Sequence, residues 1–270
     1  MRVPFVKMHG LGNDFIVLDA RTDALPSMTR SLVSALADRF TGIGCDQLIV
    51  LEPSEHADLT MRIFNHDGGE VEACGNATRA VGLLLGKAAR IETLGGLLMV
   101  DPAAGGVSVD LPAPQLEWDA IPLAYAMDTF SLPVAWEQLD SPAAVNVGNP
   151  HVVFFVADCN AVVLDRLGPE IEHDPLFPER INVNVATVES RQRIRLRVWE
   201  RGVGETRACG TGACATAVAA IRRGLVDHEV AVTLPGGELQ IAWAGQGPIR
   251  MTGPAAESFR GEFELSDYPA

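Results

Sequence analysis

The chain has 270 residues, of which 47% are hydrophobic and 21% charged, and its formal net charge is −14. This composition is sufficient for a hydrophobic core and excludes a disordered chain. The negative charge argues against a nucleic acid or an anionic membrane as partner, because both require a basic surface. A small molecule is the expected partner.

The N-terminal segment MRVPFVKMHG carries Lys7 and His9 before any apolar run can form, so it does not read as an export signal. No apolar run reaches the roughly 18 residues that a membrane-spanning helix needs. The five cysteines are scattered and odd in number, which indicates reduced thiols in a cytoplasmic protein. No C-x-x-C pair and no histidine at ligand spacing from two cysteines occurs, so no metal site is predicted.

Two segments of similar sequence open the two halves of the chain. GNDFIVLD at 12–19 has a counterpart in GNPHVVFFVAD at 148–158, and both are typical of a strand that follows a glycine turn. Further on, EACGNATRA at 72–80 has a counterpart in RACGTGACA at 207–215. The cysteines of these two phrases are 209 − 74 = 135 residues apart, half of 270. We therefore expect an internal duplication.

Each cysteine phrase follows a β-rich run and a glycine-rich turn and precedes a run of small apolar residues. The runs predict buried helices over 75–89 and 210–224. Proline-rich residues 109–128 are the expected boundary between lobes. We expect an N-terminal lobe, 1–115, on which residues 254–270 pack back, and a C-terminal lobe, 116–253.

The expected fold class is α/β, with two pseudo-symmetric lobes. Each lobe is a mostly antiparallel or mixed sheet wrapped around a central helix. A doubly wound parallel sheet is disfavoured, because the helices are too few for alternating βαβ units.

Cys74 and Cys209 stand where strand and turn give way to helix. There the unpaired N–H groups and the helix dipole stabilise a negative charge, so both thiols are expected to titrate below their usual value. The same N–H groups can hold a substrate carboxylate. They belong to Gly75, Asn76, Gly210 and Thr211.

Lobes that face each other would put the two thiols on opposite sides of one cleft. This suits removal of a proton from one face of a carbon and its return to the other, as in an epimerase of α-amino acids. Many such enzymes anchor pyridoxal phosphate on a lysine, but Lys7 and Lys87 are the only lysines, and Lys87 falls near the end of a predicted helix. A mechanism without a cofactor is therefore expected.

Other residues admit a structural interpretation. Cys45, Cys159 and Cys214 are predicted to be small buried hydrophobic residues. Asn13 and Asn149 are equally consistent with turn formation, and His151 with a hydrogen-bonded loop histidine.

Seven ordered motifs together resemble the diaminopimelate epimerase family. They are KMHGLGNDFIVLD, GCDQLIVLEP, RIFNHDGGEVEACGNATR, VGNPHVVF, FPERINVNV, VWERGVGETRACGTGACA and LPGGELQIAW. The resemblance implies cofactor-independent interconversion of LL- and meso-diaminopimelate, on the route to lysine and bacterial cell-wall peptide. It also implies the two-lobed fold of that family and leaves a homodimer open.

The resemblance also implies roles for individual residues. Cys74 and Cys209 are the acid and base, and His151 and Glu200 adjust thiol ionisation. The implied substrate contacts are Asn13, Gln47, Asn65, Gly75, Asn76, Asn149, Asn182, Glu200, Arg201, Gly210 and Thr211. Arg201 would clamp the distal carboxylate as a bidentate fork.

The chain departs from the family pattern at two places. Ala77 stands where many members have glycine, and Cys45 stands where alanine or a larger apolar residue is expected. Cys45 could therefore be a third thiol near the cleft.

Two other classes of function compete with this interpretation. One is a sister activity on the same fold, a proline or hydroxyproline epimerase or a phenazine-type isomerase. The other is a redox protein in which Cys74 and Cys209 cycle as a disulfide. Proline-type enzymes should not need Asn182 and Arg201 as a clamp, and phenazine-type enzymes should lack the paired thiols.

Overall fold

A computed structural model describes residues 1–22, 25–72 and 74–268. The chain divides into two compact units, Met1–Val109 with Gly253–Ala270, and Asp110–Thr252. The boundary lies a few residues before the expected one, inside the strand Gly106–Leu111. Among the described residues, no helix has the length and apolar character to cross a membrane.

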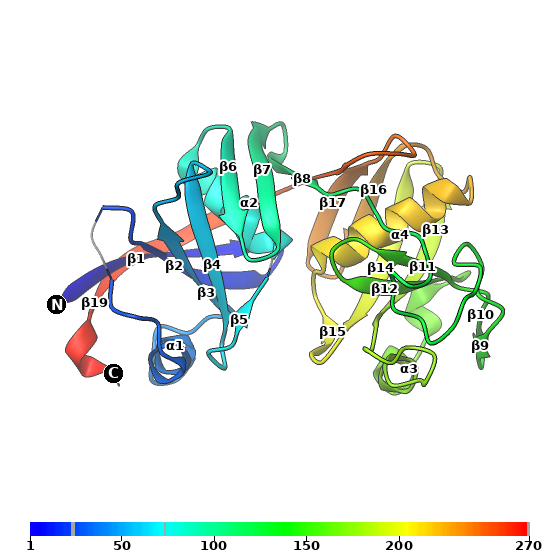
Figure 1. Cartoon of the computed structure of the whole chain (residues 1–270), viewed down its shortest axis with the longest axis horizontal. Coiled ribbons are helices and arrows are strands. Elements are labelled where there is room, and N and C mark those ends of the chain that lie inside the picture. The colour runs from blue at the N-terminus through cyan, green and yellow to red at the C-terminus, as the bar shows by residue number, and fades with distance from the viewer. Residues whose placement is uncertain (23–24, 73, 269–270) are drawn as a thin grey trace. The chain divides into compact units, whose positions relative to one another are not determined.

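The first unit is a mixed sheet with two helices (Figure 1). Its strands are β1 (Arg2–Gly10), β2 (Asn13–Asp19), β3 (Gln47–Glu52), β4 (Leu59–Asn65), β5 (Glu70–Val71), β6 (Ala89–Thr93), β7 (Gly96–Ala103), β8 (Gly106–Leu111) and β19 (Ala256–Glu264). Its helices are α1 (Arg30–Ala37), α2 (Gly75–Leu85) and the 3-10 turn η2 (Leu265–Asp267). Strand β19 pairs antiparallel with β1, so the end of the chain returns to this unit.

The second unit has the same kinds of element. Its strands are β9 (Ala135–Trp136), β10 (Leu139–Asp140), β11 (Ala143–Asn146), β12 (Pro150–Phe155), β13 (Asn182–Ser190), β14 (Arg193–Glu200), β15 (Gly204–Thr206), β16 (Glu229–Leu234), β17 (Gly237–Ala242) and β18 (Ile249–Gly253). Its helices are α3 (Leu164–Glu172), α4 (Gly210–Arg222) and the 3-10 turn η1 (Cys159–Ala161).

The two units share one order of strand pairing. In the first, β1–β2 is antiparallel, β2–β3 parallel, β3–β4 and β4–β5 antiparallel, β4–β6 parallel and β6–β7 antiparallel. In the second, β11–β12, β12–β13, β13–β14, β14–β15, β14–β16 and β16–β17 repeat these orientations in the same sequence. The mixed sheets confirm the predicted fold class.

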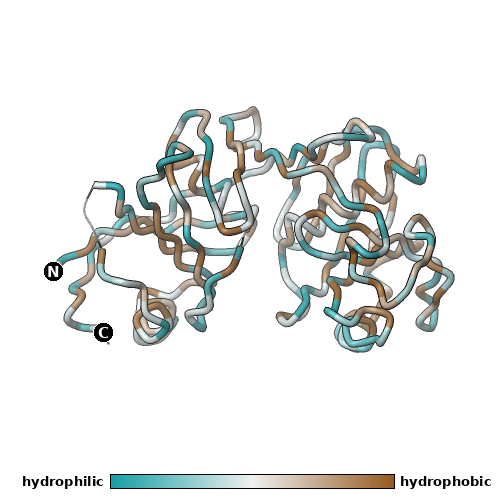
Figure 2. Tube along the Cα trace, in the orientation of Figure 1, coloured by the Kyte–Doolittle hydropathy of each residue, from teal (hydrophilic) through white to brown (hydrophobic). Residues whose placement is uncertain are grey.

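Strand β2 is buried on both faces, because helices contact both sides of the sheet at this strand. Ile16 and Leu18 of β2 belong to a cluster with Leu32 and Leu36 of α1. Phe15 and Val17, which alternate with them, are also buried, and α2 contacts β1, β2 and β7. Such strands read as continuous hydrophobic runs rather than alternating ones, and the brown segments follow them in Figure 2.

The two central helices begin at the predicted residues and end earlier than expected. Helix α2 stops at Leu85 because Gly86 adopts the left-handed conformation, with φ 63°, which caps a helix C-terminus. Lys87 therefore lies beyond the helix and is exposed. Helix α4 is buried along almost its whole length, and its small side chains allow it to contact strands β11 to β14, β16 and β17. Helices α1 and α3 were not expected from the sequence.

Candidate active site

Three of the expected substrate residues lie at the ends of neighbouring strands in the first unit's sheet. Asn13 opens β2, Gln47 opens β3 and Asn65 ends β4. Gln47 is directly opposite Asn65 in the antiparallel pair, and its Nε2 donates to Asn65 Oδ1 at 3.0 Å. Gln47 Oε1 is buried and has no hydrogen-bond partner among the described residues. A buried acceptor of this kind is costly unless a ligand donor pairs with it.

Cys74 is the N-cap residue of α2, in extended conformation, as the sequence indicates. Its sulfur lies 3.8 Å from Asn13 Oδ1, which also accepts a hydrogen bond from Asn76 Nδ2 at 3.2 Å. The sulfur makes no capping hydrogen bond to the helix N–H groups. The first thiol therefore lies beside neutral amides.

A charged cluster beneath Asn13 holds its side chain in place. Asn13 Nδ2 donates to Asp46 Oδ2 at 3.0 Å, and Arg39 donates to Asp46 Oδ1 at 2.6 Å. Arg39 also binds Asp14, and Lys7 donates to Asp14 and to the carbonyl of Gly44. Burial raises the pKa of Asp14, but hydrogen bonds and charges from Arg39 and Lys7 outweigh this and hold it well below its usual range.

Arg79 fixes Gly75 and Asn76, the first two residues of α2, whose N–H groups are expected to hold the substrate carboxylate. Its guanidinium is fully buried, donates to Asn76 Oδ1 at 2.6 Å and reaches the carbonyl of Gly75 at 3.4 Å. Because Asn76 Oδ1 accepts from Arg79, its Nδ2 is the end that faces Asn13. The Asn76 amide is thus oriented by a cation.

Cys209 is the N-cap residue of α4 and differs from Cys74 in its contacts. Its sulfur accepts from the Gly212 N–H at 3.3 Å and lies 3.4 Å from Thr211 Oγ1. A Cβ added at Gly212 would come within 3.3 Å of this sulfur and 3.0 Å of Val198 Cγ2. Glycine at this position therefore lets the sulfur reach the helix N–H.

The expected low pKa of the second thiol is wrong in this structure. Burial raises the pKa of Cys209 well above its ordinary value, and the nearby negative charge of Glu200 raises it further. The hydrogen bonds from Thr211 and Gly212 lower it, but by less. Helix position was a correct inference, whereas the sequence gives no measure of the desolvation that dominates here.

Glu200 ends β14 and lies close enough to Cys209 to affect the ionisation of its thiol. Thr206 Oγ1 donates to Glu200 Oε1. Burial raises the pKa of Glu200, and the hydrogen bonds from Thr206 and Cys209 oppose that rise. Glu200 can therefore accept a proton more readily than an exposed glutamate, next to a thiol that holds its own proton tightly.

His151 lies in β12, fully buried, between two asparagines. Its Nδ1 is 3.2 Å from Asn184 Oδ1 and its Nε2 is 3.0 Å from Asn149 Oδ1. Burial lowers the pKa of His151 to about 4; its hydrogen bond to Asn184 Oδ1 raises it, and the charge of Arg201 lowers it. The ring is therefore neutral at physiological pH.

Asn182 and Arg201 lie close together, because Asn182 begins β13 and Arg201 directly follows the end of the neighbouring strand β14. Asn182 is buried, donates to the carbonyl of Pro150 at 2.8 Å and accepts from the Arg201 N–H at 2.9 Å. The Arg201 side chain is exposed and one nitrogen donates to the carbonyl of Glu179 at 3.0 Å. The turn after Arg201 is fixed by buried Glu172, whose carboxylate accepts a hydrogen bond from the Gly202 N–H at 2.9 Å.

The other cysteines lie in the core, as predicted. Cys45, Cys159 and Cys214 are buried. Burial raises the pKa of Cys45 to about 12, partly offset by the charge of Lys7. Cys45 is therefore inaccessible and protonated, so it does not act as a third reactive thiol.

The sequence analysis missed the residues that support the site. These are Lys7, Asp14, Arg39, Asp46, Arg79, Glu172, Asn184, Thr206 and Thr216. One signal was available: Asn184 follows Asn182 by two residues in a strand, so both side chains lie on one face. The cluster around Asp14 joins residues from three segments, which a single sequence does not connect.

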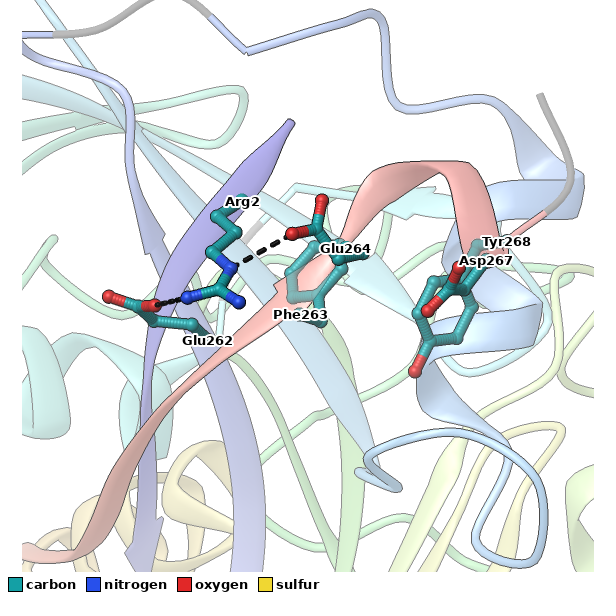
Figure 3. A pocket seen from close by; sticks show the side chains of 6 residues that line it. All are labelled: Arg2, Glu262, Phe263, Glu264, Asp267 and Tyr268. Atoms are coloured by element: carbon teal, nitrogen blue, oxygen red, sulfur yellow. Dashed lines mark hydrogen bonds and ion pairs between the residues drawn. The ribbon is translucent and has the colours of Figure 1, made fainter.

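Two hollows of the surface lie away from the expected site residues. One, of about 390 Å³, is lined by Arg2, Glu262, Phe263, Glu264, Asp267 and Tyr268, and the ion pairs of Arg2 cross it (Figure 3). Another lies beside Tyr125, Trp136 and Asp174. Neither includes an expected site residue. Within the described ranges, no group of three or more His, Cys, Asp or Glu is placed to hold a metal ion.

Comparison with known proteins identifies relatives over the whole chain. The sequence profile of diaminopimelate epimerase matches residues 5–115 and 143–257. Diaminopimelate epimerase from Erythrobacter litoralis is 68% identical over 268 residues, which are 99% of this chain and 100% of that protein. The enzyme of the same name from Zymomonas mobilis is 55% identical over 269 residues, 99% of this chain and 100% of that protein.

Solved structures with much lower identity share the fold. A phenazine biosynthesis protein from Enterococcus faecalis has a TM-score of 0.73 at 15% identity and covers 98% of this chain and 100% of its own. A hydroxyproline epimerase from Agrobacterium vitis has a TM-score of 0.69 at 16% identity, with 97% and 91% covered. At these identities the likeness concerns the two-lobed fold alone.

Proposed function

The chain belongs to the diaminopimelate epimerase family and is an isomerase that acts on an amino acid; from this premise we propose that it interconverts LL- and meso-diaminopimelate by two-base proton transfer. In this mechanism Cys74 and Cys209 are the acid and the base. The observation that carries the proposal is the repeated placement of a cysteine at the N-cap of the central helix of each unit. No organic cofactor or metal takes part in the proposed reaction.

The proton transfers balance without any external group. One cysteine, as thiolate, takes the α-proton from one face of the carbon, and its thiol forms. The other cysteine, as thiol, gives its proton to the opposite face and becomes a thiolate. The substrate gains no atom and loses none, and the two cysteines have exchanged protonation states, so the next turnover runs in reverse or follows a proton reset.

The proposed carbanion stabilisation comes from the helix N-termini. The N–H groups of Gly75, Asn76, Gly210 and Thr211 begin α2 and α4. Such groups attract a carboxylate and the charge that spreads onto it as the α-proton leaves. Asn13, Gln47, Asn65, Asn149 and Asn182 supply amides for the ammonium and carboxylate groups, and exposed Arg201 is proposed to select the distal carboxylate.

Glu200 is proposed to reset the second thiol. It lies beside Cys209, and both groups have raised pKa values because they are buried. A proton that moves from sulfur to carboxylate leaves a thiolate without exposing a charge to solvent. The pair therefore keeps one negative charge in either state, and burial disfavours a second.

The lysines support a mechanism without pyridoxal phosphate. A Schiff base requires a deprotonated lysine amine. Lys7 is buried and paired with Asp14, and Lys87 is exposed beyond the end of α2.

Turnover of LL-diaminopimelate in a coupled assay tests the proposal. We expect activity in the purified protein without added pyridoxal phosphate and after exhaustive chelation, and none with proline or hydroxyproline. Activity on proline alone would favour the sister activity, and a requirement for pyridoxal phosphate or metal would overturn the mechanism. A stable Cys74–Cys209 redox couple without turnover would favour the redox alternative. Activity would support a place in lysine and peptidoglycan precursor synthesis in the cytoplasm.

A further inference from the structure

His151 sits in a chain of side chains whose donors and acceptors can be assigned from one end. Asn184 Nδ2 lies 3.0 Å from the carbonyl oxygen of Gly212 and 3.0 Å from Thr216 Oγ1, both in α4. A backbone carbonyl only accepts hydrogen bonds. The end of the Asn184 amide that faces α4 must therefore be the NH₂ group, and its carbonyl oxygen must face His151.

This assignment fixes the tautomer of His151. Asn184 Oδ1 lies 3.2 Å from His151 Nδ1 and requires a donor there, so Nδ1 carries the proton. The ring is fully buried beside the charge of Arg201, which disfavours a second proton. Nε2 is therefore an acceptor.

The tautomer in turn decides the orientation of Asn149. Asn149 Oδ1 lies 3.0 Å from His151 Nε2. With Nε2 as an acceptor, this contact sets two acceptors face to face, whereas an NH₂ group in the same place completes a hydrogen bond, and the two ends of an amide have nearly the same shape. A half-turn of the amide therefore brings the NH₂ end to His151 and directs the carbonyl oxygen away from it.

We propose that His151 is a positioning residue, which as the Nδ1–H tautomer turns the carbonyl oxygen of Asn149 outward to accept a hydrogen bond from the substrate's ammonium group. The role rests on the proposed function, because it assigns Asn149 to an amino-acid substrate. An ammonium group carries only donors, so an outward NH₂ would repel it.

The first unit has an equivalent asparagine, Asn13, which is oriented by a carboxylate instead of an imidazole. Asn13 and Asn149 occupy matching places in the two strand orders: Asn13 is the first residue of β2, and Asn149 immediately precedes β12. The NH₂ of Asn13 donates to Asp46, and its carbonyl oxygen faces Cys74 and Asn76. A carboxylate in one unit and a neutral imidazole in the other thus leave each asparagine with its carbonyl oxygen directed away from the group that orients it.

Nitrogen NMR of the full-length protein tests the tautomer directly. The protein is labelled with ¹⁵N-histidine, and long-range ¹H–¹⁵N correlations assign each ring nitrogen; the signals absent from H151Q belong to His151. We expect a neutral Nδ1–H ring at pH 7 that stays neutral at pH 5.5. An Nε2–H ring, or a doubly protonated ring at pH 5.5, would overturn the proposal.

Kinetics of two substitutions separate orientation from packing. H151Q can offer an acceptor oxygen near the place of Nε2, whereas H151L offers none. We expect H151L to raise the KM for LL-diaminopimelate about tenfold with kcat changed less than about threefold, and H151Q to recover most of the loss. A residue needed only for packing would give the reverse order, because leucine suits a buried site better than glutamine. That reversed order would overturn the proposal.

A matched control is H173L. His173 is exposed, and its Nδ1 also hydrogen-bonds an acceptor, the carbonyl of Pro169 at 2.9 Å. Its loss should leave KM unchanged. If the wild-type protein does not turn over LL-diaminopimelate, the proposed substrate is wrong while the NMR experiment still decides the tautomer. If it does and His151 is Nε2–H, the positioning role alone is wrong.

Discussion

The two thiols have equivalent positions in their units but opposite surroundings. Strand register places Asn65 opposite Gln47 in the first unit; in the second, Asn182 and Glu200 each lie one residue beyond the pair Val183–Trp199. Cys74 therefore lies in a unit with a neutral amide where Cys209 has a carboxylate. The carboxylate adds to burial in raising the pKa of Cys209.

The first turns of the two central helices also differ. The third residue of α2 is Ala77 and that of α4 is Gly212. Only the second cysteine accepts a capping hydrogen bond from its helix. A repeated fold can thus present two thiols while their protonation is set separately by a few neighbouring side chains. Two-base epimerisation needs one thiol and one thiolate at a time, and the surroundings of Cys209 favour its thiol form.

The largest effect is expected from removal of either sulfur. C74A and C209A should each lower kcat/KM by at least about 10³-fold, since a positioned proton-transfer group contributes about 10²- to 10⁴-fold and these two act as a unit. The coupled assay measures this, with C159A as a control in the core of the second unit. Near-native turnover by either mutant would end the two-base assignment.

Glu200 is the sharpest difference between the units. E200Q removes the charge that raises the pKa of Cys209 and the proposed proton acceptor, so we expect kcat to fall about 10²-fold while the thiol pKa falls. The pH dependence of alkylation, compared between E200Q and E200Q/C209A, reports that pKa. E205Q, which breaks only the ion pair with Arg197, is the control. An unchanged thiol pKa would contradict the electrostatic role.

Substitutions at the third residue of each helix test whether the capping hydrogen bond of Cys209 matters for catalysis. G212A should push the sulfur away from the N–H of residue 212 and lower kcat/KM about tenfold, which corresponds to about 1.4 kcal/mol, the size of one lost hydrogen bond. A77G lies at the matching position of α2, where no capping bond exists, and should change kcat/KM by less than about threefold. Equal losses in both variants would show that the capping bond of Cys209 has no catalytic weight.

Protonation of His151 should lower the free energy of unfolding as the pH falls. Its folded pKa of about 4 lies below the ordinary value of 6.5, so the stability it contributes is complete above pH 6.5 and lost as pH falls through about 4. The loss between pH 7 and pH 4 is about 3 kcal/mol from this group. Urea unfolding of H151Q, which cannot titrate, should show a pH dependence weaker by that amount. An identical pH dependence in H151Q and wild type would mean that the ring is not buried neutral.

Local patterns in the sequence were enough for the helix starts and the mixed sheets. The cysteine phrases placed Cys74 and Cys209 at N-caps because small residues after a glycine turn allow a buried helix to begin there. The pKa of Cys209 could not be predicted, because it depends on burial by residues distant in sequence. The orientation of Asn149 was equally hidden, since it follows from a chain through Asn184 to a carbonyl of α4.

Turnover of LL-diaminopimelate in deuterated water tests the two-base claim most directly. At low conversion, mass spectrometry should find one deuterium at the inverted α-carbon of the meso product and protium retained in the remaining LL substrate. This follows because one cysteine keeps the proton it removed while the other delivers a solvent deuteron. Product that retains the substrate proton, or LL substrate that exchanges as fast as product forms, would contradict the account.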